Sequence, residues 1–303
     1  MRSITKKIET LRRAEAETTL KAKSEIWERL KANDVPKKDV LAIARCAGIL
    51  AAKKTADLIP YCHPLLLDFV SIEFVFEGEM LAVHAVAETV AKTGVEMEAL
   101  TASSLAALTV YDMLKPLDES IEIMGTRLLS KTGGKSCFKE KIPSGFKAAV
   151  IVTSDSTFKG TRSNRSGKLI QEKLTSLGIE STYTIVPDES PVIAKAIEAS
   201  CREGAQLVLT TGGTGLGPRD VTVEATTAVI DREIPGVMEA ARSHGQRRTP
   251  YAMLSRGLAG QRGKTLIVNL PGSSKGVEES LDVLFPSILH AYKMMKGFGH
   301  DSK

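Results

Sequence analysis

The chain lacks the features that mark secreted, membrane-bound or metal-clustered proteins. Its four cysteines, Cys46, Cys62, Cys137 and Cys201, include no close pair, which argues against a zinc knuckle, a redox motif or a disulfide framework. No apolar run approaches the length that spans a bilayer, and the basic N-terminal residues lack the apolar segment of a signal peptide. We therefore expect a cytoplasmic protein with no membrane partner.

Aromatic residues and excess charge are also scarce. Only 5% of the 303 residues are aromatic and no Lys/Arg run is interleaved with them, so stacking on nucleic-acid bases is poorly supported. The net charge of +5 suits a small anionic substrate at least as well as a nucleic acid, and we expect no nucleic-acid partner. With 43% hydrophobic and 25% charged residues, the composition is that of a soluble protein, and the length predicts two domains.

The residue pattern changes between positions 139 and 146, where proline, serine and glycine lie among alternating charges. This composition predicts a linker between an N-terminal domain over residues 1–138 and a C-terminal domain over 147–303. Helices followed by paired strands in the first half indicate an α+β domain. Strands alternating with helices in the second half predict an α/β, Rossmann-like domain with a mostly parallel sheet.

In the first domain, the pattern predicts one or two surface helices within residues 1–34, strands over 69–77 and 81–90, and a long helix over 94–115. Asp112 and Lys115 share one face near the end of that helix. Such a pair is more often a surface ion pair than a catalytic one, and a loop histidine such as His63 is about as often packed or merely exposed as functional.

The second domain is organised around residues 207–222. Residues 207–209 predict a buried strand, and a loop rich in glycine and threonine follows, then Arg219 and Asp220. Glycine permits positive φ and close approach to an anion, while Thr222 predicts the N-cap of a helix with Glu224 in its first turn. This succession favours a site for phosphate and its metal ion over a plain turn.

Four polar loops follow strands of the predicted parallel sheet. They carry Asp155, Asp188, residues 212–220 and residues 271–275. Because ligands of such sheets bind beyond the carboxyl ends of the strands, we expect these loops to converge on one site.

Several motifs of the first half carry a close resemblance to a known family. They are Cys62-His63-Pro64-Leu65, Glu96-Met97-Glu98, Tyr111-Asp112-Met113 and Gly133-Gly134-Lys135-Ser136, with Lys37 and Asp39 upstream. Over about residues 10–136 the chain resembles cyclic pyranopterin monophosphate synthase, the MoaC family.

That resemblance implies a ferredoxin-like α+β fold. The implied reaction converts a 3′,8-cyclised dihydro-GTP into cyclic pyranopterin monophosphate and releases pyrophosphate, with no tightly bound cofactor. The catalytic residues that it implies are Lys37, Asp112 and Lys115. The substrate-binding residues that it implies are Tyr61, Cys62, His63, Met97, Glu98 and Lys135.

The second half resembles the MogA/MoaB family of molybdopterin adenylyltransferases over residues 147–296. The matching motifs are Thr153-Ser154-Asp155-Ser156, Pro187-Asp188, residues 210–222, Ala252-Met253-Leu254-Ser255-Arg256 and Asn269-Leu270-Pro271-Gly272-Ser273. The resemblance implies transfer of AMP from Mg-ATP to the terminal phosphate of molybdopterin, with Asp188 and Asp220 as essential acids and magnesium ligands. The substrate-binding residues that it implies are Ser154, Asp155, Thr211, Gly212, Gly213, Thr214, Gly215, Ser255, Pro271, Gly272 and Ser273.

Alternatives to a two-headed enzyme of molybdenum cofactor synthesis stay open at this point. Asn164 stands where the adenylyltransferases usually have Asp, so the C-terminal half is alternatively a non-catalytic pterin-binding or scaffold module. A third hypothesis is a generic nucleotide-binding regulator, but this hypothesis does not explain Lys37, His63 and Asp112. The family resemblance implies a hexameric synthase and a trimeric adenylyltransferase, so we expect a homo-oligomer in multiples of three, acting on pterin and purine nucleotide substrates.

Overall fold

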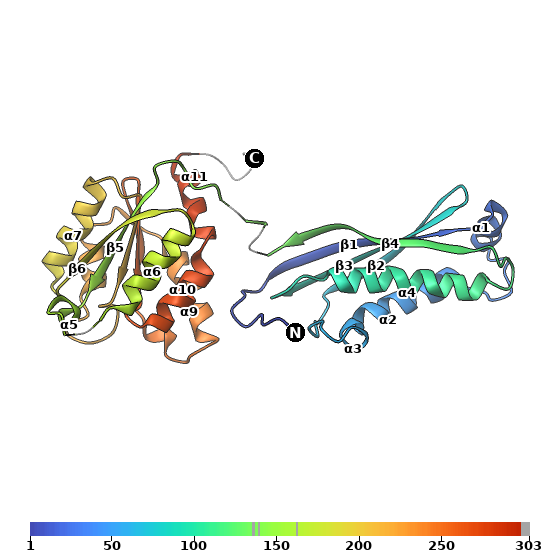
Figure 1. The fold of residues 1–303 in the computed structure, drawn as a ribbon, viewed down its shortest axis with the longest axis horizontal. Coiled ribbons are helices and arrows are strands. Elements are labelled where there is room, and N and C mark those ends of the chain that lie inside the picture. The colour runs from blue at the N-terminus through green and yellow to red at the C-terminus, as the bar shows by residue number, and fades with distance from the viewer. Residues whose placement is uncertain (135–136, 139, 162, 298–303) are drawn as a thin grey trace. The chain divides into compact units, whose positions relative to one another are not determined.

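The computed structural model describes residues 1–134, 137–138, 140–161 and 163–297 (Figure 1). The chain divides into two compact units, Met1–Cys137 and Phe138–Lys303, each with a hydrophobic core of its own. Residues 140–146 of the predicted linker fall within the second unit, and the predicted domain boundaries stay a prediction. Within the described ranges, no helix has both the length and the apolar character needed to cross a bilayer.

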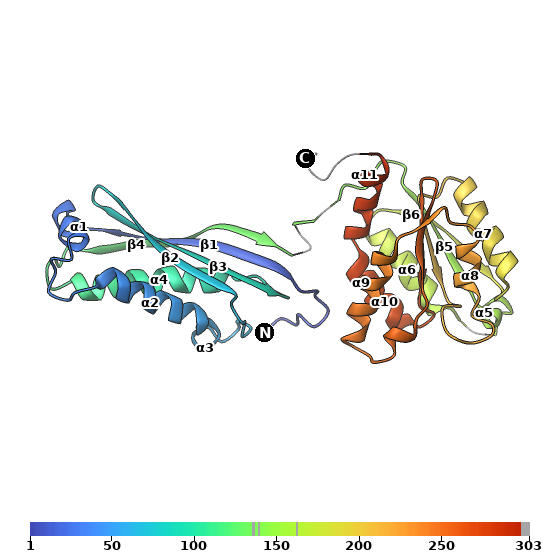
Figure 2. The same cartoon turned by 180° about the vertical axis from the view of Figure 1, so that it is seen from behind.

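The N-terminal unit is an antiparallel sheet with its helices on one face (Figures 1 and 2). Its strands, in the order β2-β3-β1-β4, are β1 (Thr10–Lys21), β2 (Phe69–Glu77), β3 (Met80–Ala91) and β4 (Glu122–Gly133). Its helices are α1 (Ser24–Lys31), α2 (Val40–Lys53), α3 (Thr55–Leu58) and α4 (Glu96–Leu114). The unit is therefore α+β, as predicted, with the long helix α4 packed on the sheet.

Of the one or two helices predicted within residues 1–34, one is present as α1, but the prediction missed β1, which is an inner strand of the sheet. Ala14, Ala16 and Thr18 are completely buried and alternate with half-buried or charged neighbours. This is the period of two that marks a strand. Alanine and threonine give a weak apolar signal, so the charged residues between them concealed the alternation.

Small side chains set the distance between α2 and α4. A Cβ at Gly48 of α2 would lie 2.7 Å from the carbonyl oxygen of Ala102 and 2.1 Å from Ile72 Cδ1. Ala102 and Ala106 of α4 are completely buried at this interface. The close contact between the two helices therefore requires that position 48 carry no side chain.

The C-terminal unit is a six-stranded, mostly parallel sheet flanked by helices, as predicted. Its strands, in the order β6-β5-β7-β10-β9-β8, are β5 (Lys147–Thr153), β6 (Glu180–Val186), β7 (Leu207–Thr211), β8 (Arg232–Glu233), β9 (Ala259–Arg262) and β10 (Thr265–Leu270). The first four in this order are parallel, and β9 and β8 complete the sheet in antiparallel pairing. Its helices are α5 (Asp155–Phe158), α6 (Arg165–Ser176), α7 (Ser190–Arg202), α8 (Thr222–Thr227), α9 (Pro235–Gln246), α10 (Ser274–Leu284) and α11 (Ala291–Met295), with short 3-10 turns at η2 (Ala252–Leu254) and η3 (Ser287–His290).

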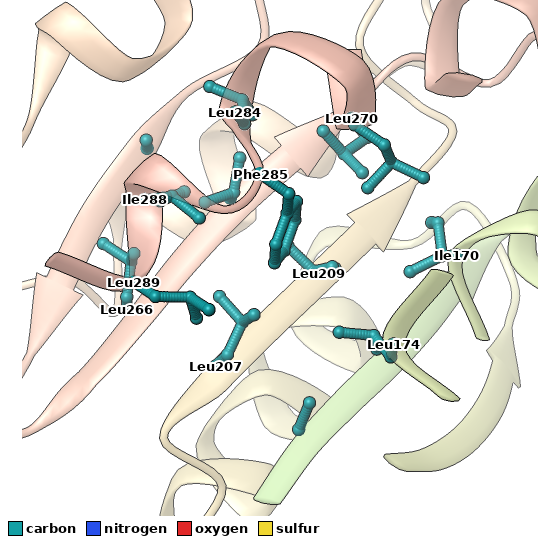
Figure 3. Close-up of a cluster of buried hydrophobic side chains, with 14 of the residues drawn as sticks. Ile170, Leu174, Leu207, Leu209, Leu266, Leu270, Leu284, Phe285, Ile288 and Leu289 are labelled. Carbon is teal, nitrogen blue, oxygen red and sulfur yellow. The ribbon is translucent and has the colours of Figure 1, made fainter. Parts of the chain in front are cut away.

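Apolar clusters cover both faces of this sheet. Leu207 and Leu209 of β7 belong to one cluster and Val208 to the other, as the pleat requires. Figure 3 shows Leu207 and Leu209 beside Ile170 of α6 and Phe285, which follows α10. The buried strands hold the loops at their carboxyl ends on a rigid base.

The segment before β5 is attached to the end of the chain. Glu140 Oε1 lies 2.6 Å from His290 Nδ1, and Glu140 Oε2 lies 2.9 Å from Lys293 Nζ. The ring of the buried Phe146 meets the edge of Tyr292 at a centroid distance of 4.8 Å. Much of the predicted linker is therefore part of the folded C-terminal unit.

Candidate functional sites

Lys37, Asp112 and Lys115 come together at the C-terminal end of α4. Lys115 Nζ lies 2.8 Å from Asp112 Oδ1, and Lys37 Nζ lies 3.2 Å from Asp112 Oδ2 and 3.2 Å from the Asp112 carbonyl oxygen. Hydrogen bonds from Lys115 and then Lys37 hold the pKa of the Asp112 carboxyl below its usual value, and Asp112 raises the pKa of Lys115. About half of each side chain is exposed, so the ionised cluster is open to a substrate.

The loop that carries Lys37 is fixed by two residues with left-handed backbone conformations. Asn33 has φ 53° and Asp39 has φ 60°, and Asn33 Oδ1 accepts a hydrogen bond from the Asp39 amide at 3.0 Å. Asp39 is the N-cap residue of α2, but its side chain makes no capping hydrogen bond, and its Oδ1 lies 3.4 Å from Asn33 Nδ2. Asparagine and aspartate tolerate this conformation better than other residues with a side chain, so the local sequence fits the bend.

The other predicted residues of this unit lie near the N-terminal end of α4. Glu98 is only 4% exposed, and burial raises the pKa of its carboxyl. Burial and then the charge of Glu98 raise the pKa of the Cys62 thiol, which places Cys62 close by. His63 is half-buried, while Tyr61 and Met97 are exposed. Lys135 lies outside the described residues.

Two residues at this end of α4 were missed by the sequence reasoning. Lys131 Nζ lies 3.0 Å from Glu96 Oε1, and Lys131 belongs to β4, which ends at Gly133. Burial alone would raise the pKa of Glu96, but its backbone hydrogen bond and Lys131 outweigh burial and lower it. Only the pairing of β1 with β4 places Lys131 here, and a Glu–Lys pair so distant in sequence gives no local signal.

The two groups of candidate residues are far apart within one chain. At 1.5 Å per residue, Glu98 and Asp112 are about 21 Å apart along the axis of α4. The structure thus assembles the Lys37, Asp112 and Lys115 cluster and separates it from Glu98 and Cys62.

In the C-terminal unit, the glycine-rich loop follows β7 as predicted and has the predicted backbone. Gly212 has φ 105° and Gly213 has φ 62°. A Cβ at Gly212 would lie 2.2 Å from the Thr153 carbonyl oxygen, and one at Gly213 would lie 2.2 Å from Thr222 Oγ1. Both conformation and space therefore require glycine at these two positions.

The helix after the loop starts differently from the prediction. Thr222 is the first residue of α8 rather than its N-cap, a position that Val221 occupies. Thr222 Oγ1 instead donates a hydrogen bond to Thr153 Oγ1 at 3.0 Å. The Thr222 hydroxyl therefore binds Thr153 at the end of β5 and makes no capping hydrogen bond to α8.

Asp155 and Asp188 bind each other through their backbone amides. The Asp155 amide lies 3.0 Å from Asp188 Oδ2, and the Asp188 amide lies 3.1 Å from Asp155 Oδ1. Burial, together with the nearby charges of Asp155 and Asp220, raises the pKa of Asp188. Arg219 Nη2 donates to Asp155 Oδ2 at 2.5 Å, so a cation faces this group of acids.

Asp220 is fixed within its own loop, where its Oδ2 accepts a hydrogen bond from the Gly217 amide at 2.9 Å. Arg256, which the sequence reasoning placed in a matching motif without a role, closes the loop. It donates to the carbonyl oxygens of Gly215 at 2.7 Å and Asp220 at 2.5 Å, and it pairs with Glu224. The contacts cross from residue 256 to residues 215–224, so only the fold reveals them.

A cavity of about 440 Å³ lies at the carboxyl ends of β5, β7 and β10. Its lining includes the predicted residues Ser154, Thr211, Gly212, Gly272 and Ser273. Asn164 and several further serines and threonines complete it. Asn164 Oδ1 accepts a hydrogen bond from the Gly167 amide at 2.5 Å and caps α6. The substitution of Asn for Asp keeps this capping oxygen and removes its charge.

A neighbouring cavity of about 410 Å³ includes the predicted Ser255 and Pro271 and shares Ser273 with the first. Met238, Ala241 and Tyr251 give it apolar walls, and Arg242 and Lys275 supply cations. Two adjoining cavities, one lined by hydroxyls and loop glycines and one partly apolar, suit two ligands that meet.

The acids of this unit fit a magnesium ion that is shared with phosphate. Among the residues that the structure describes, no group of three or more His, Cys, Asp or Glu side chains could hold a metal by itself. Magnesium usually takes one or two carboxylates and completes its shell with water and substrate phosphates. Asp188 and Asp220 offer such a pair beside the glycine-rich loop.

Comparison with known proteins divides the chain in the same way. The profile of the MoaC family matches residues 1–134, and that of a probable molybdopterin binding domain matches residues 149–290. The chain is 43% identical to the molybdenum cofactor biosynthesis bifunctional protein of Chlorobaculum tepidum, over 99% of this chain and 96% of that protein.

Single-domain proteins match one half each. The cyclic pyranopterin monophosphate synthase of Geobacillus kaustophilus is 52% identical over 45% of this chain and 86% of its own length. The crystal structure of the molybdopterin biosynthesis enzyme MoaB from Thermus thermophilus is 47% identical, covers 50% of this chain and 97% of its own, and superposes with a TM-score of 0.48.

Proposed function

The chain belongs to the bifunctional molybdenum cofactor biosynthesis proteins, and from this membership we propose that its two units catalyse two separate steps of that synthesis. The N-terminal unit forms cyclic pyranopterin monophosphate from 3′,8-cyclised dihydro-GTP and releases pyrophosphate. The C-terminal unit transfers AMP from ATP to molybdopterin.

The ionised cluster of Lys37, Asp112 and Lys115 is the observation that carries the first activity. Rearranging a cyclised purine requires proton transfers, for which Asp112 is the base. Lys37 and Lys115 keep Asp112 ionised and offer positive charge to the phosphates of the substrate. Glu98, whose pKa is raised by burial, retains its proton to higher pH than an exposed glutamate and is suited to donate it.

The first site is completed by a partner subunit. Glu98 lies too far from Asp112 along α4 to act with it in the same chain, and Cys62 lies near Glu98, so a second copy supplies one of the two groups. The assembly is a homo-oligomer in multiples of three. The strand order β2-β3-β1-β4 and the alternation of strands with α2 and α4 support assignment of this unit to the ferredoxin-like folds.

In the C-terminal unit, the cavity beside the glycine-rich loop takes the phosphates of ATP, and the adjoining partly apolar cavity takes the pterin. Gly212 and Gly213 let the loop pack closely on Thr153 and Thr222, Gly212 lines the cavity, and Arg219 supplies positive charge. Asp188 and Asp220 hold magnesium, which neutralises the phosphate charge when bound. The protein's contribution is to hold the reacting groups in line.

Two assays on the purified chain test both activities. Incubation with the cyclised GTP intermediate should yield cyclic pyranopterin monophosphate and pyrophosphate. Incubation with molybdopterin and Mg-ATP should yield adenylylated molybdopterin. Binding of molybdopterin without transfer of AMP would assign the second unit a binding or scaffold role, and failure of both reactions would contradict the whole proposal.

A further inference from the structure

A chain of buried hydroxyl groups lies directly beneath the glycine-rich loop of the C-terminal unit. Thr153, Thr211 and Thr222, from β5, β7 and the start of α8, are all buried there. Thr153 Oγ1 donates to the Thr211 carbonyl oxygen at 3.3 Å and accepts a hydrogen bond from Thr222 Oγ1 at 3.0 Å. The hydroxyl of Thr153 therefore contacts both the entrance and the exit of the loop.

Main-chain pairing does not make this connection. The ladder between β5 and β7 ends at the pair Val152 and Thr211, one residue before Thr153. Beyond it, the side chain of Thr153 joins β5 to the loop, and the Thr222 amide donates to the Gly213 carbonyl oxygen at 3.1 Å. Because a Cβ at Gly212 or Gly213 would strike Thr153 or Thr222, the loop rests directly on these two residues.

The bridge connects the two acids of the proposed metal site. Thr153 lies two residues before Asp155. The backbone amides of Asp155 and Asp188 each donate a hydrogen bond to the carboxylate of the other residue. Thr222 lies two residues after Asp220. The hydrogen bond between the hydroxyls of Thr153 and Thr222 thus joins the segment that holds Asp188 to the segment that holds Asp220, below the exposed ion pair between Arg219 and Asp155.

We propose that Thr153 is a positioning residue whose hydroxyl sets the spacing between Asp188 and Asp220 and the path of the glycine-rich loop. The inference rests on the proposed transfer of AMP, for which that spacing matters. Thr153 uses its single proton and one lone pair in these two hydrogen bonds, and a valine of the same shape would leave Thr222 Oγ1 and the Thr211 carbonyl without this partner.

Three variants of the full-length chain test the proposal. Thr153→Val removes the hydroxyl, and Thr153→Ser retains it. Thr265→Val is the matched control, because Thr265 is also buried and its Oγ1 donates to the Ala205 carbonyl oxygen at 2.7 Å, at the opposite end of the same sheet. The synthase activity of the N-terminal unit normalises the amount of chain in each preparation, and denaturant unfolding reports on the fold of the C-terminal unit.

The kinetic measurement is AMP transfer as a function of magnesium concentration. We expect Thr153→Val to lower kcat by about 10-fold to 100-fold, the loss that a misplacement of about 1 Å causes, and to shift the magnesium dependence to higher concentration. Thr153→Ser should restore both, and Thr265→Val should stay within about twofold of the wild type because the two sites are distant. Equal kcat and magnesium dependence in the two valine variants would overturn the inference.

Hydrogen exchange tests the positioning without any substrate. The amides of residues 212–222 should exchange faster in Thr153→Val than in Thr265→Val or the wild type. Unchanged protection would overturn the inference even where catalysis is impaired. If the wild type transfers no AMP, the proposed function of the unit fails, while the exchange result still decides whether Thr153 holds the loop.

Discussion

The two units present their candidate catalytic residues in opposite ways. In the C-terminal unit, residues from the loops after β5, β7 and β10 line a cavity at one edge of a mostly parallel sheet, within a single chain. In the N-terminal unit, the corresponding residues lie at the two ends of α4, and the Lys37, Asp112 and Lys115 cluster is half exposed. Sheet topology brings the first set together within one chain, whereas the second set stays separated within one chain, which is why we propose that a partner copy completes it.

The largest effect should come from Asp112. Asp112→Asn and Lys115→Ala should each lower formation of cyclic pyranopterin monophosphate by about 10² to 10⁴, the contribution typical of a general base, because each change breaks the ionised cluster. Product formation by the purified variants measures this, denaturant unfolding checks that the N-terminal unit is folded, and unchanged AMP transfer shows that the loss is confined to that unit. Turnover like that of the wild type in either variant would remove that residue from the catalytic set.

Mixing two inactive variants tests whether the site is shared. Asp112→Asn and Glu98→Gln damage opposite ends of α4, so unfolding and reassembling them together should create some intact sites and recover part of the activity. Two copies of the same variant provide the control. Absence of recovery in verified mixed oligomers would mean that each chain completes its own site.

Substitution of the two acids of the C-terminal unit should reduce only AMP transfer. Asp188→Asn and Asp220→Asn should each lower AMP transfer by roughly 10², since each removes charge that the proposed magnesium site requires. The formation of cyclic pyranopterin monophosphate should not change. An unaltered rate and magnesium dependence in both variants would show that the metal is held elsewhere.

Separating the units should affect stability rather than catalysis. The fragments 1–137 and 138–303 should each fold and keep one activity, because each unit has its own core. A fragment starting at residue 147 loses Phe146 and the Glu140 contacts and should be less stable than 138–303 by about 3 kcal/mol or more. Denaturant unfolding of the two C-terminal fragments measures the difference, and equal stability would show that residues 138–146 are a passive tether.

The smallest effect concerns the pH dependence of stability at Glu98. Its pKa is raised in the folded state, so the folded chain binds more protons than the unfolded chain between the two pKa values. Stability is therefore lost as pH rises through that window, and Glu98→Gln should remove this loss. We expect the Tm of the variant to rise relative to the wild type as pH increases above the usual glutamate pKa, although synthase activity falls. A constant difference in Tm would contradict the burial of an ionisable group at this position.

The accuracy of the sequence predictions follows the strength of the local signal. The strand β7 and the loop conformation at Gly212 were predicted correctly, since a continuous apolar run and a glycine pair are local features. The strand β1 was missed because its inward residues are alanine and threonine. Lys131 and Arg256 gain their contacts only from strand pairing and loop packing, which no spacing in the sequence encodes.

The absence of a side chain at Gly48 affects the position of Lys37 through helix α2. Gly48 is a position of close contact between α2 and α4. The first residue of α2 lies about 12 Å from it along the helix axis, at 1.5 Å per residue. Lys37 precedes that end of the helix, while Asp112 belongs to α4 itself. A methyl group at position 48 would push α2 away from α4 and tilt it, which would increase the distance between Lys37 and Asp112. The geometry of the charged cluster therefore depends on a residue that has no functional group.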